Sequence, residues 1–221
     1  MLPAEVAVEE AMVAAVDMEL LHRRMGHLGS ANLMRLQKEE MVRGLGSGVV
    51  GEMGPCQGCV LGRPRTPPHP TADVTWRATK QLELVHADLA GPMRGPSWGG
   101  ARHLFVIFDD FSRRSWVILL KNKSDVTPRV KEWISLVENE SVQKLVKLRT
   151  DNGGGFTSNS LKTWMKVKVV QQQFIPPRNP HSNGVGERMN RALQDKARSM
   201  MQHSGLGGGS WGEVFLAANY L

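Results

Sequence analysis

The chain has 221 residues, of which 41% are hydrophobic, enough for one medium domain and a smaller module. Its net charge is +7, and because residues 1–21 hold five acidic and no basic residues, the remainder carries +12, which suits a polyanion such as nucleic acid. Only two cysteines occur, the N-terminus is acidic, and no apolar run approaches the ~18 residues of a membrane span, so we expect a soluble intracellular protein without a disulfide framework or a signal peptide.

The N-terminal part predicts two helices. Residues 4–21 intersperse Ala, Val, Met and Leu with Glu and are typical of a helix that lies partly outside the domain proper. A second, shorter helix is expected to begin near Ser30, whose hydroxyl can cap it, and to bury Leu33 and Leu36.

Four metal-ligating side chains flank this second helix with the spacing His-x4-His-x28-Cys-x2-Cys: His22, His27, Cys56 and Cys59. Two imidazoles and two thiolates suit tetrahedral zinc. A segment of ~40 residues is too small to be held together by burial alone, so a structural metal has a physical role here. A lone Cys-x2-Cys can be redox-active and His pairs are common on surfaces, but the four together in one short segment favour zinc.

A proline-rich linker follows the cysteines. Residues 62–80 contain several prolines and basic residues, which predicts an extended chain, and His69 within it is not expected to bind metal. We therefore divide the chain into an acidic extension (1–18), a zinc module (19–66), a linker (67–80) and a larger body (81–221).

The larger body alternates between strand and helix patterns. Strands are predicted at 82–89, 102–109, 115–120, 145–150 and 167–174, and helices at 124–137, 158–165 and about 185–202. The second and third strands should form an antiparallel hairpin because the turn between them is short. The order β-β-β-α-β-α-β-α, with carboxylates ending the first and fourth strands, is typical of the ribonuclease H-like fold, a mixed five-stranded sheet with flanking helices.

Three carboxylates stand out in this body. Asp88 ends the first strand, Asp151 follows the fourth in Thr-Asp-Asn-Gly-Gly, and Glu187 begins the last long helix, with 35 residues between the last two. Acidic side chains brought together repel one another unless divalent cations lie between them, and that arrangement suits two-metal phosphoryl transfer. Asp109 and Asp110 close a hairpin strand without a polymerase context, and we interpret them as turn residues.

The last long helix is apolar on one side and polar on the other. Its apolar stripe comprises Val185, Met189, Ala192, Leu193 and Met200, and Lys196 falls inside that stripe, where its stem can snorkel. Its polar side comprises Glu187, Asn190, Arg191, Gln194 and Arg198. Glu187 is therefore expected on a face suited to metal and phosphate. The alternative is a solvated face with a Glu187–Arg191 pair worth about 0.3 kcal/mol, which we would prefer if Asp88 and Asp151 were absent.

Three segments carry a resemblance to a known family. They are Leu-His-Arg-Arg-Met-Gly-His-Leu (21–28), Leu-Glu-Leu-Val-His-Ala-Asp-Leu-Ala-Gly-Pro (82–92) and Asn-Gly-Val-Gly-Glu-Arg-Met-Asn-Arg (183–191). The first resembles the GAG-pre-integrase zinc module, and the others resemble the integrase catalytic core, of copia-type LTR retrotransposon Pol polyproteins. The resemblance covers roughly residues 19–221.

The resemblance implies a DNA integrase, a metal-dependent polynucleotidyl transferase. It implies zinc on His22, His27, Cys56 and Cys59, and two Mg²⁺ or Mn²⁺ on Asp88, Asp151 and Glu187. Such an enzyme hydrolyses DNA near the 3′ ends of the element's double-stranded cDNA and then joins those ends to target DNA. We expect DNA contacts from Asn152, Asn183, Arg188, Arg191 and Arg198. We also expect a homo-oligomer acting in the nucleus, after a cytoplasmic particle stage, with no membrane partner.

The sequence departs from the family pattern near the expected site. Gly155 replaces the usual Glu, residues 178–182 replace the usual Tyr-Thr-Pro-Gln-Gln, and residues 165–169 lack the usual acidic-then-Gly turn. Because the chain ends inside the helix after the catalytic one, we expect a core truncated at its C-terminus. Two alternatives stay open. One is a non-catalytic remnant that binds nucleic acid and zinc. The other is a nuclease of the same fold acting on RNA–DNA hybrids, against which the zinc module and the carboxylate on a late helix argue.

Overall fold

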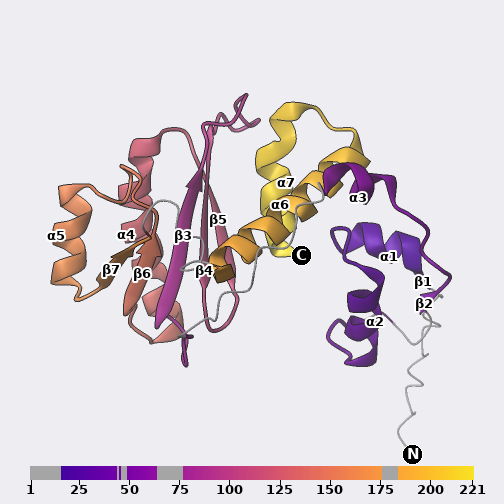
Figure 1. Cartoon of the computed structure of the whole chain (residues 1–221), viewed down its shortest axis with the longest axis horizontal. Helices are drawn as coiled ribbons and strands as arrows, with labels where there is room; N and C mark the ends of the chain where they lie inside the picture. Colours follow the sequence, from indigo (N-terminus) through magenta and orange to yellow (C-terminus); the bar gives the residue numbers. More distant parts are fainter. Residues whose placement is uncertain (1–15, 44, 46–48, 64–76, 176–183) are drawn as a thin grey trace, which may run out of the picture. The chain divides into compact units, whose positions relative to one another are not determined.

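The computed structural model describes residues 16–43, 45, 49–63, 77–175 and 184–221 (Figure 1). The chain divides into two compact units, residues 1–57 and residues 58–221. In the described part of the chain, no helix is both long enough and apolar enough to cross a membrane.

The first unit is built on two short helices, α1 (Met18–Arg24) and α2 (Ser30–Lys38). Leu21 of α1 and Leu33 of α2 are both buried in one small apolar cluster. Two-residue strands β1 (Val16–Asp17) and β2 (Val49–Val50) pair in parallel beside the helices. Such a small cluster can supply little stability without help from a metal or another element.

Two sequence predictions for this unit need correction. The helix expected over 4–21 begins at Met18, because Asp17 is extended and its carboxylate caps the helix by accepting a hydrogen bond from the Leu20 N–H (3.1 Å). The part of that prediction in residues 1–15 lies outside the described residues. Ser30 is the first helical residue of α2, whose N-cap is Gly29 without a side-chain bond, so Ser30 does not cap the helix. Burial of Leu33 is confirmed, while Leu36 is half-buried.

The second unit contains a mixed sheet of the ribonuclease H-like kind. Its strands are β3 (Leu84–Ala90), β4 (His103–Asp109), β5 (Ser115–Leu120), β6 (Lys147–Thr150) and β7 (Gln171–Phe174), in the spatial order β5-β4-β3-β6-β7. The predicted hairpin is confirmed, since β4 pairs antiparallel with β5. Strands β3, β6 and β7 are parallel, so their carboxyl ends meet at one edge.

Helices cover both faces of this sheet (Figure 1). On one face α4 (Val126–Ser141) and α5 (Asn159–Val167) pack over Val85, Phe105 and Leu148. On the other face α6 (Gly184–Ser204) and α7 (Trp211–Tyr220) pack over Leu104, Val106 and Phe108. Strand β4 is buried along its whole length because it lies between these two layers.

The fifth predicted strand was too long. Strand β7 begins only at Gln171, whereas Val167 ends α5 and Val169 has a positive φ of 59°. The β-branched residues that favoured a strand are instead in a turn, where Val169 is 85% exposed. The glutamines form the strand because β6 offers them a parallel partner at the edge of the sheet.

Candidate metal centres and active site

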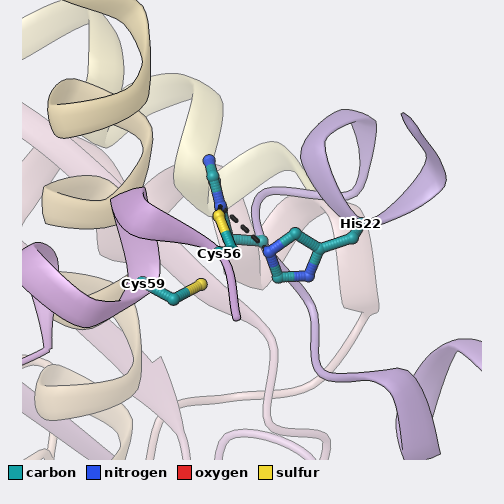
Figure 2. A group of neighbouring side chains, drawn as sticks. His22, Cys56 and Cys59 are labelled. Atoms are coloured by element: carbon teal, nitrogen blue, oxygen red, sulfur yellow. Dashed lines mark hydrogen bonds between the residues drawn. The ribbon is translucent and has the colours of Figure 1, made fainter. Parts of the chain in front are cut away.

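The four side chains of the predicted zinc site lie together. One ligand atom from each of His22, His27, Cys56 and Cys59 lies within 4.8 Å of all the others. Cys56 immediately precedes α3 (Gln57–Gly62) and Cys59 lies within it, so one turn of helix brings both thiols to the same side. Figure 2 shows His22, Cys56 and Cys59 turned toward one another.

Two of the distances between these atoms match those around a tetrahedral zinc ion. His22 Nε2 and His27 Nδ1 are 3.1 Å apart, and Cys56 Sγ is 3.5 Å from His27 Nδ1. Ligand bonds of ~2.0 Å for nitrogen and ~2.3 Å for sulfur place tetrahedral ligands about 3.3 Å (N–N) and about 3.5 Å (N–S) apart. His22 Nδ1 lies 2.8 Å from the Leu28 carbonyl oxygen. When Nδ1–H donates to that oxygen, Nε2 carries the lone pair that a metal needs.

Two of the three predicted catalytic carboxylates lie close to the carboxyl ends of neighbouring strands. Asp88 does not end its strand as predicted, because β3 continues for two residues to Ala90, whereas Asp151 directly follows β6. In the parallel pair of β3 and β6, Ala87 is opposite Thr150, so the next residues, Asp88 and Asp151, are level with each other. Parallel strands lie ~4.8 Å apart, and residues in register point to the same face. For Asp88 this is the face of its β4 partner Val106, which packs toward α6 and α7.

Helix α6 brings the third carboxylate to this face. Glu187 is exposed in the first turn of α6, and Asn190 follows one turn later on the same side of the helix. The Asn190 side-chain amide donates a hydrogen bond to Asp88 Oδ2 (2.7 Å). This contact joins the amino-terminal part of the helix to β3.

The charges of all three carboxylates meet at Asp88. Burial raises the pKa of Asp88 above its ordinary value of 3.8, the negative charge of Asp151 raises it further, and the charge of Glu187 adds to both, while the Leu89 N–H and Asn190 lower it. Like charges held this close disfavour ionisation, and a divalent cation between them removes the penalty. The donor set is made of carboxylate oxygens, which Mg²⁺ prefers.

Comparison with known proteins matches two domain families to this chain. Residues 3–63 match the GAG-pre-integrase domain, which spans the His and Cys ligands, and residues 78–180 match the Integrase core domain, which spans Asp88 and Asp151.

The chain carries a GAG-pre-integrase domain and an integrase core domain.

Its relatives include Pol polyproteins of copia-type retrotransposons. The chain is 34% identical over 206 residues to the retrovirus-related Pol polyprotein from transposon TNT 1-94 of Nicotiana tabacum, which covers 93% of this chain and 15% of the relative. It is 28% identical over 167 residues to that from transposon RE2 of Arabidopsis thaliana, covering 75% of this chain and 11% of the relative. A Pro-Pol polyprotein of simian foamy virus type 3 is 27% identical over 146 residues, which is 66% of this chain and 12% of the relative. The chain thus spans less than a sixth of each relative's length.

Behind the carboxylates of the integrase core lies a polar layer that the sequence did not reveal. His86, two residues before Asp88, is buried with its Nε2 3.4 Å from Asp110 Oδ1. Arg149, two residues before Asp151, donates from Nε and Nη2 to Gln173 Oε1 (3.3 and 3.1 Å). Burial lowers the pKa of Arg149, and the charge of Asp110 opposes that shift. Alternation along β3 and β6 puts these side chains on the face that carries the acids.

Asp109 and Asp110 are structural, as their position at the end of β4 suggested. Asp109 is fully buried and accepts hydrogen bonds from the N–H groups of Leu82 (2.9 Å) and Ser112 (2.7 Å). Asp110 accepts from the Ala78 N–H (3.0 Å) and from Arg113 (3.3 Å). The two carboxylates close the β4–β5 turn and anchor the chain entering β3, at the edge of the sheet opposite Asp88.

The residues expected to contact DNA are differently placed. Asn152 and Arg188 are exposed and Arg191 is half-buried, while Asn183 lies outside the described residues. Arg198 donates from Nε to the Gly62 carbonyl (2.8 Å) and also bonds Asp195, so its guanidinium is engaged within the protein. The DNA contacts stay predictions.

Two features of the site need a correction or an addition. Ala192, assigned to the apolar stripe of the last helix, is exposed, and among the α6 residues whose burial the structure describes the buried ones are Gly186, Ala197 and Ser199. Asn190 was placed on the polar side of the helix but not recognised as the partner of Asp88. Its spacing of three residues from Glu187 was the signal that could have found it.

Gly155, which replaces the Glu usual at this position, is buried against the first turn of α4. A Cβ atom at Gly155 would lie 3.1 Å from Val126 Cβ. The Gly155 carbonyl also accepts a hydrogen bond from Thr127 Oγ1 (3.2 Å). The loop after Asp151 therefore packs closely against α4 because Gly155 has no side chain.

Proposed function

We propose that this chain is the catalytic part of a DNA integrase, a polynucleotidyl transferase that processes the 3′ ends of retrotransposon cDNA and joins them to target DNA. The observation that carries the proposal is the placement of Asp88 level with Asp151 near the carboxyl ends of two parallel strands, with the charge of Glu187 acting on Asp88. Membership of the integrase core family supports the same reaction class.

Asp88, Asp151 and Glu187 are the residues that would hold two Mg²⁺ or Mn²⁺ ions, which supply activation of the attacking oxygen and stabilisation of the leaving oxygen. Asn190 holds Asp88 in place from the helix that carries Glu187. The Gly153 N–H donates to Asp151 Oδ1 (3.0 Å) and fixes the second carboxylate from its own loop. These two contacts orient the acids before substrate arrives.

The remaining parts of the proposal concern the partners. Exposed Arg188 and half-buried Arg191 follow Glu187 on α6, where they suit phosphates of double-stranded DNA, and exposed Asn152 follows Asp151. Asn183, which lies outside the described residues, stays part of the proposal from the sequence alone. Most of that affinity should fall with salt, because phosphate contacts release counterions. Zinc on the His and Cys ligands stabilises the first unit. We further propose that the chain forms a homo-oligomer and acts in the nucleus, after a stage in a cytoplasmic particle.

The experiment is a disintegration assay, in which the protein with Mg²⁺ or Mn²⁺ resolves a branched DNA that mimics the integration product. We expect joined DNA from the wild type and none from Glu187→Gln, which keeps the size of the side chain but removes its charge. Glu132→Gln, on the exposed side of α4, is the matched control and should be as active as the wild type.

A second candidate function is a non-catalytic remnant that binds nucleic acid and zinc. The observation in its favour is Gly155, where the usual acidic side chain is absent from the loop that follows Asp151. Wild-type protein that is folded, zinc-loaded and able to bind DNA, yet as inactive as Glu187→Gln, would establish this function instead.

A further inference from the structure

A large aromatic side chain is exposed beside the proposed active site. Trp98 lies in the segment that joins β3 to β4, and 64% of its surface is open to solvent. Single exposed apolar residues are common on proteins. Trp98 differs because the backbone that carries it is fixed.

A set of tight hydrogen bonds holds this segment in one conformation. The Ser97 N–H donates to the Ala101 carbonyl and the Gly100 N–H donates to the Ser97 carbonyl, both at 2.8 Å. The Ala101 N–H donates to the buried hydroxyl of Ser97 (3.1 Å). The backbone at residues 97–101 is thereby closed into a turn, so Trp98 projects from a rigid base.

Two further bonds fasten the segment to the layer of α6 and α7. The Trp98 N–H donates to the Gly209 carbonyl (2.9 Å), and Trp211 Nε1 donates to the Gly95 carbonyl (3.1 Å). The indole rests against Gly209, since a Cβ atom there would lie 3.0 Å from Trp98 Cδ1. One edge of the ring therefore contacts the backbone near Gly209, while most of the residue's surface faces solvent.

The segment that carries Trp98 is cationic. The sequence contains no acidic residue from Leu89 to Phe108, whereas Arg94 and Arg102 flank the tryptophan and are exposed. Lys121 is also exposed, and its Cε lies 3.8 Å from where a Cβ on Gly100 would be. An aromatic ring among basic side chains is the usual composition of a surface that binds single-stranded nucleic acid.

The segment lies at the same edge of the sheet as Asp88. Strand β3 ends there, and β5, which runs in the same direction as β3, also ends there. Ser97 packs beside Leu119, because a Cβ on Gly212 would lie within 2.9 Å of both side chains. Leu119 is two strands from Ala90 in register, which corresponds to about 10 Å at a strand spacing of ~4.8 Å. Asp88 lies two residues before Ala90, which adds about 7 Å along β3. A few nucleotides of a DNA strand are enough to reach from this segment to Asp88.

We propose that Trp98 is a base-stacking site for an unpaired nucleotide of the DNA that lies in the active site, with the neighbouring phosphates on Arg94, Arg102 and Lys121. The base must be unpaired because both faces of a base inside a duplex are covered by its neighbours. The inference deepens the proposed function and rests on it for the identity of the DNA, but its test requires no catalysis.

The test compares two fluorescein-labelled single strands of equal length without added Mg²⁺, one of deoxythymidines and one abasic, so that both carry the same phosphates. Fluorescence anisotropy of the full chain gives Kd for each. We expect the wild type to bind the thymidine strand roughly 5- to 150-fold more tightly than the abasic strand, as stacking on one aromatic side chain provides. Trp98→Ala should lose this ratio and keep its Kd for the abasic strand, while Trp98→Tyr should keep most of it.

Phe111→Ala is the matched control, because Phe111 is 53% exposed in the β4–β5 turn at the opposite edge of the sheet and should leave the ratio unchanged. Arg94→Gln should weaken both strands alike. Absence of a base preference in the wild type, or equal loss for both strands in Trp98→Ala, overturns the proposal. A Trp98-dependent preference in a protein that fails the disintegration assay would leave the stacking site standing and refute only the transferase.

Discussion

Substitution of Glu138 tests how the fold positions β6, the strand that precedes Asp151. Glu138 lies near the end of α4, only 4% exposed, and accepts a hydrogen bond from the Leu145 N–H (3.1 Å), just before β6 begins. Lys144 and Lys168 place their ammonium groups 3.2 and 3.1 Å from its other oxygen. One carboxylate therefore joins α4, the start of β6 and the turn after α5.

The cost of Glu138→Ala follows from these contacts. The buried Leu145 N–H would lose its acceptor, which costs about 1–3 kcal/mol. The lysines contribute less, about 0–1 kcal/mol, because Lys144 is 76% exposed and both can turn to water. Together with lost packing we expect about 2–4 kcal/mol less stability. Glu138→Gln keeps an acceptor oxygen for Leu145 and should cost about half as much.

Urea unfolding followed by circular dichroism measures the difference. Glu132→Ala, an exposed glutamate on the same helix, should change the free energy of unfolding by less than ~0.5 kcal/mol. If Glu138→Ala lowered the free energy of unfolding as little as Glu132→Ala, the contacts of Glu138 would contribute no more than an exposed ion pair and the reasoning would be refuted.

The same contacts predict a pH dependence. Burial pushes the pKa of Glu138 upward, but the Leu145 N–H, Lys168 and Lys144 outweigh burial and hold it below its ordinary value of 4.5. A carboxyl whose pKa is lower in the folded state contributes stability above 4.5, and this contribution disappears as the pH falls through the lowered pKa. The difference in stability between wild type and Glu138→Gln should therefore shrink on acidification below pH 4.5.

Three further predictions concern the two sites. Removing zinc with a chelator, or Cys56→Ser, should abolish metal binding by metal analysis and reduce helical circular dichroism; an unchanged spectrum would contradict a structural metal. Asp88→Asn should stabilise the Mg²⁺-free protein at neutral pH by roughly 1 kcal/mol. The raised pKa of Asp88 means that its ionised form destabilises the folded state, and Asn carries no charge. The gain should vanish below pH 3.8, where Asp88 is protonated in both the folded and the unfolded protein. If the wild type and Asp88→Asn were equally stable in urea at pH 7, the repulsion between Asp88 and the other two carboxylates would be refuted. Gly155→Ala should destabilise by about 1–3 kcal/mol through Val126, while Gly154→Ala, which has no neighbour within 4 Å, should not, and equal effects would count against the packing.

The parts of the site that depend on local patterns were predictable from sequence. The zinc ligands follow from the spacing of four chemically distinctive residues, and their approach within 4.8 Å confirms the grouping. Asp88 lies near the end of an apolar strand and Asp151 follows one, and the rule that parallel strands end on the same side of a sheet predicts that they are neighbours.

The sequence-based predictions were wrong or incomplete where tertiary contacts determine the local structure. Val169 has the side chain of a strand residue, but the chain must turn there to reach the edge of β6, and Gln171 begins the strand instead. A helical wheel put Ala192 inside, whereas α7 covers α6 from the side of Ala197, through Val214 and Ala218. The Asn190–Asp88 bond joins residues 102 positions apart. The spacing along the helix puts Asn190 on the side of Glu187, but only the tertiary fold shows that Asp88 is its partner.

The central claim is that Asp88, Asp151 and Glu187 share divalent metal. Its most direct measurement replaces Mg²⁺ by Fe²⁺ in the presence of duplex DNA, generates hydroxyl radicals with ascorbate and peroxide, and locates the backbone cuts by mass spectrometry. Our account predicts cuts beside all three residues, which excess Mg²⁺ suppresses and which Asp88→Asn loses. Cuts confined to the His and Cys ligands, or cuts at the acids that persist unchanged in Asp88→Asn, would contradict it.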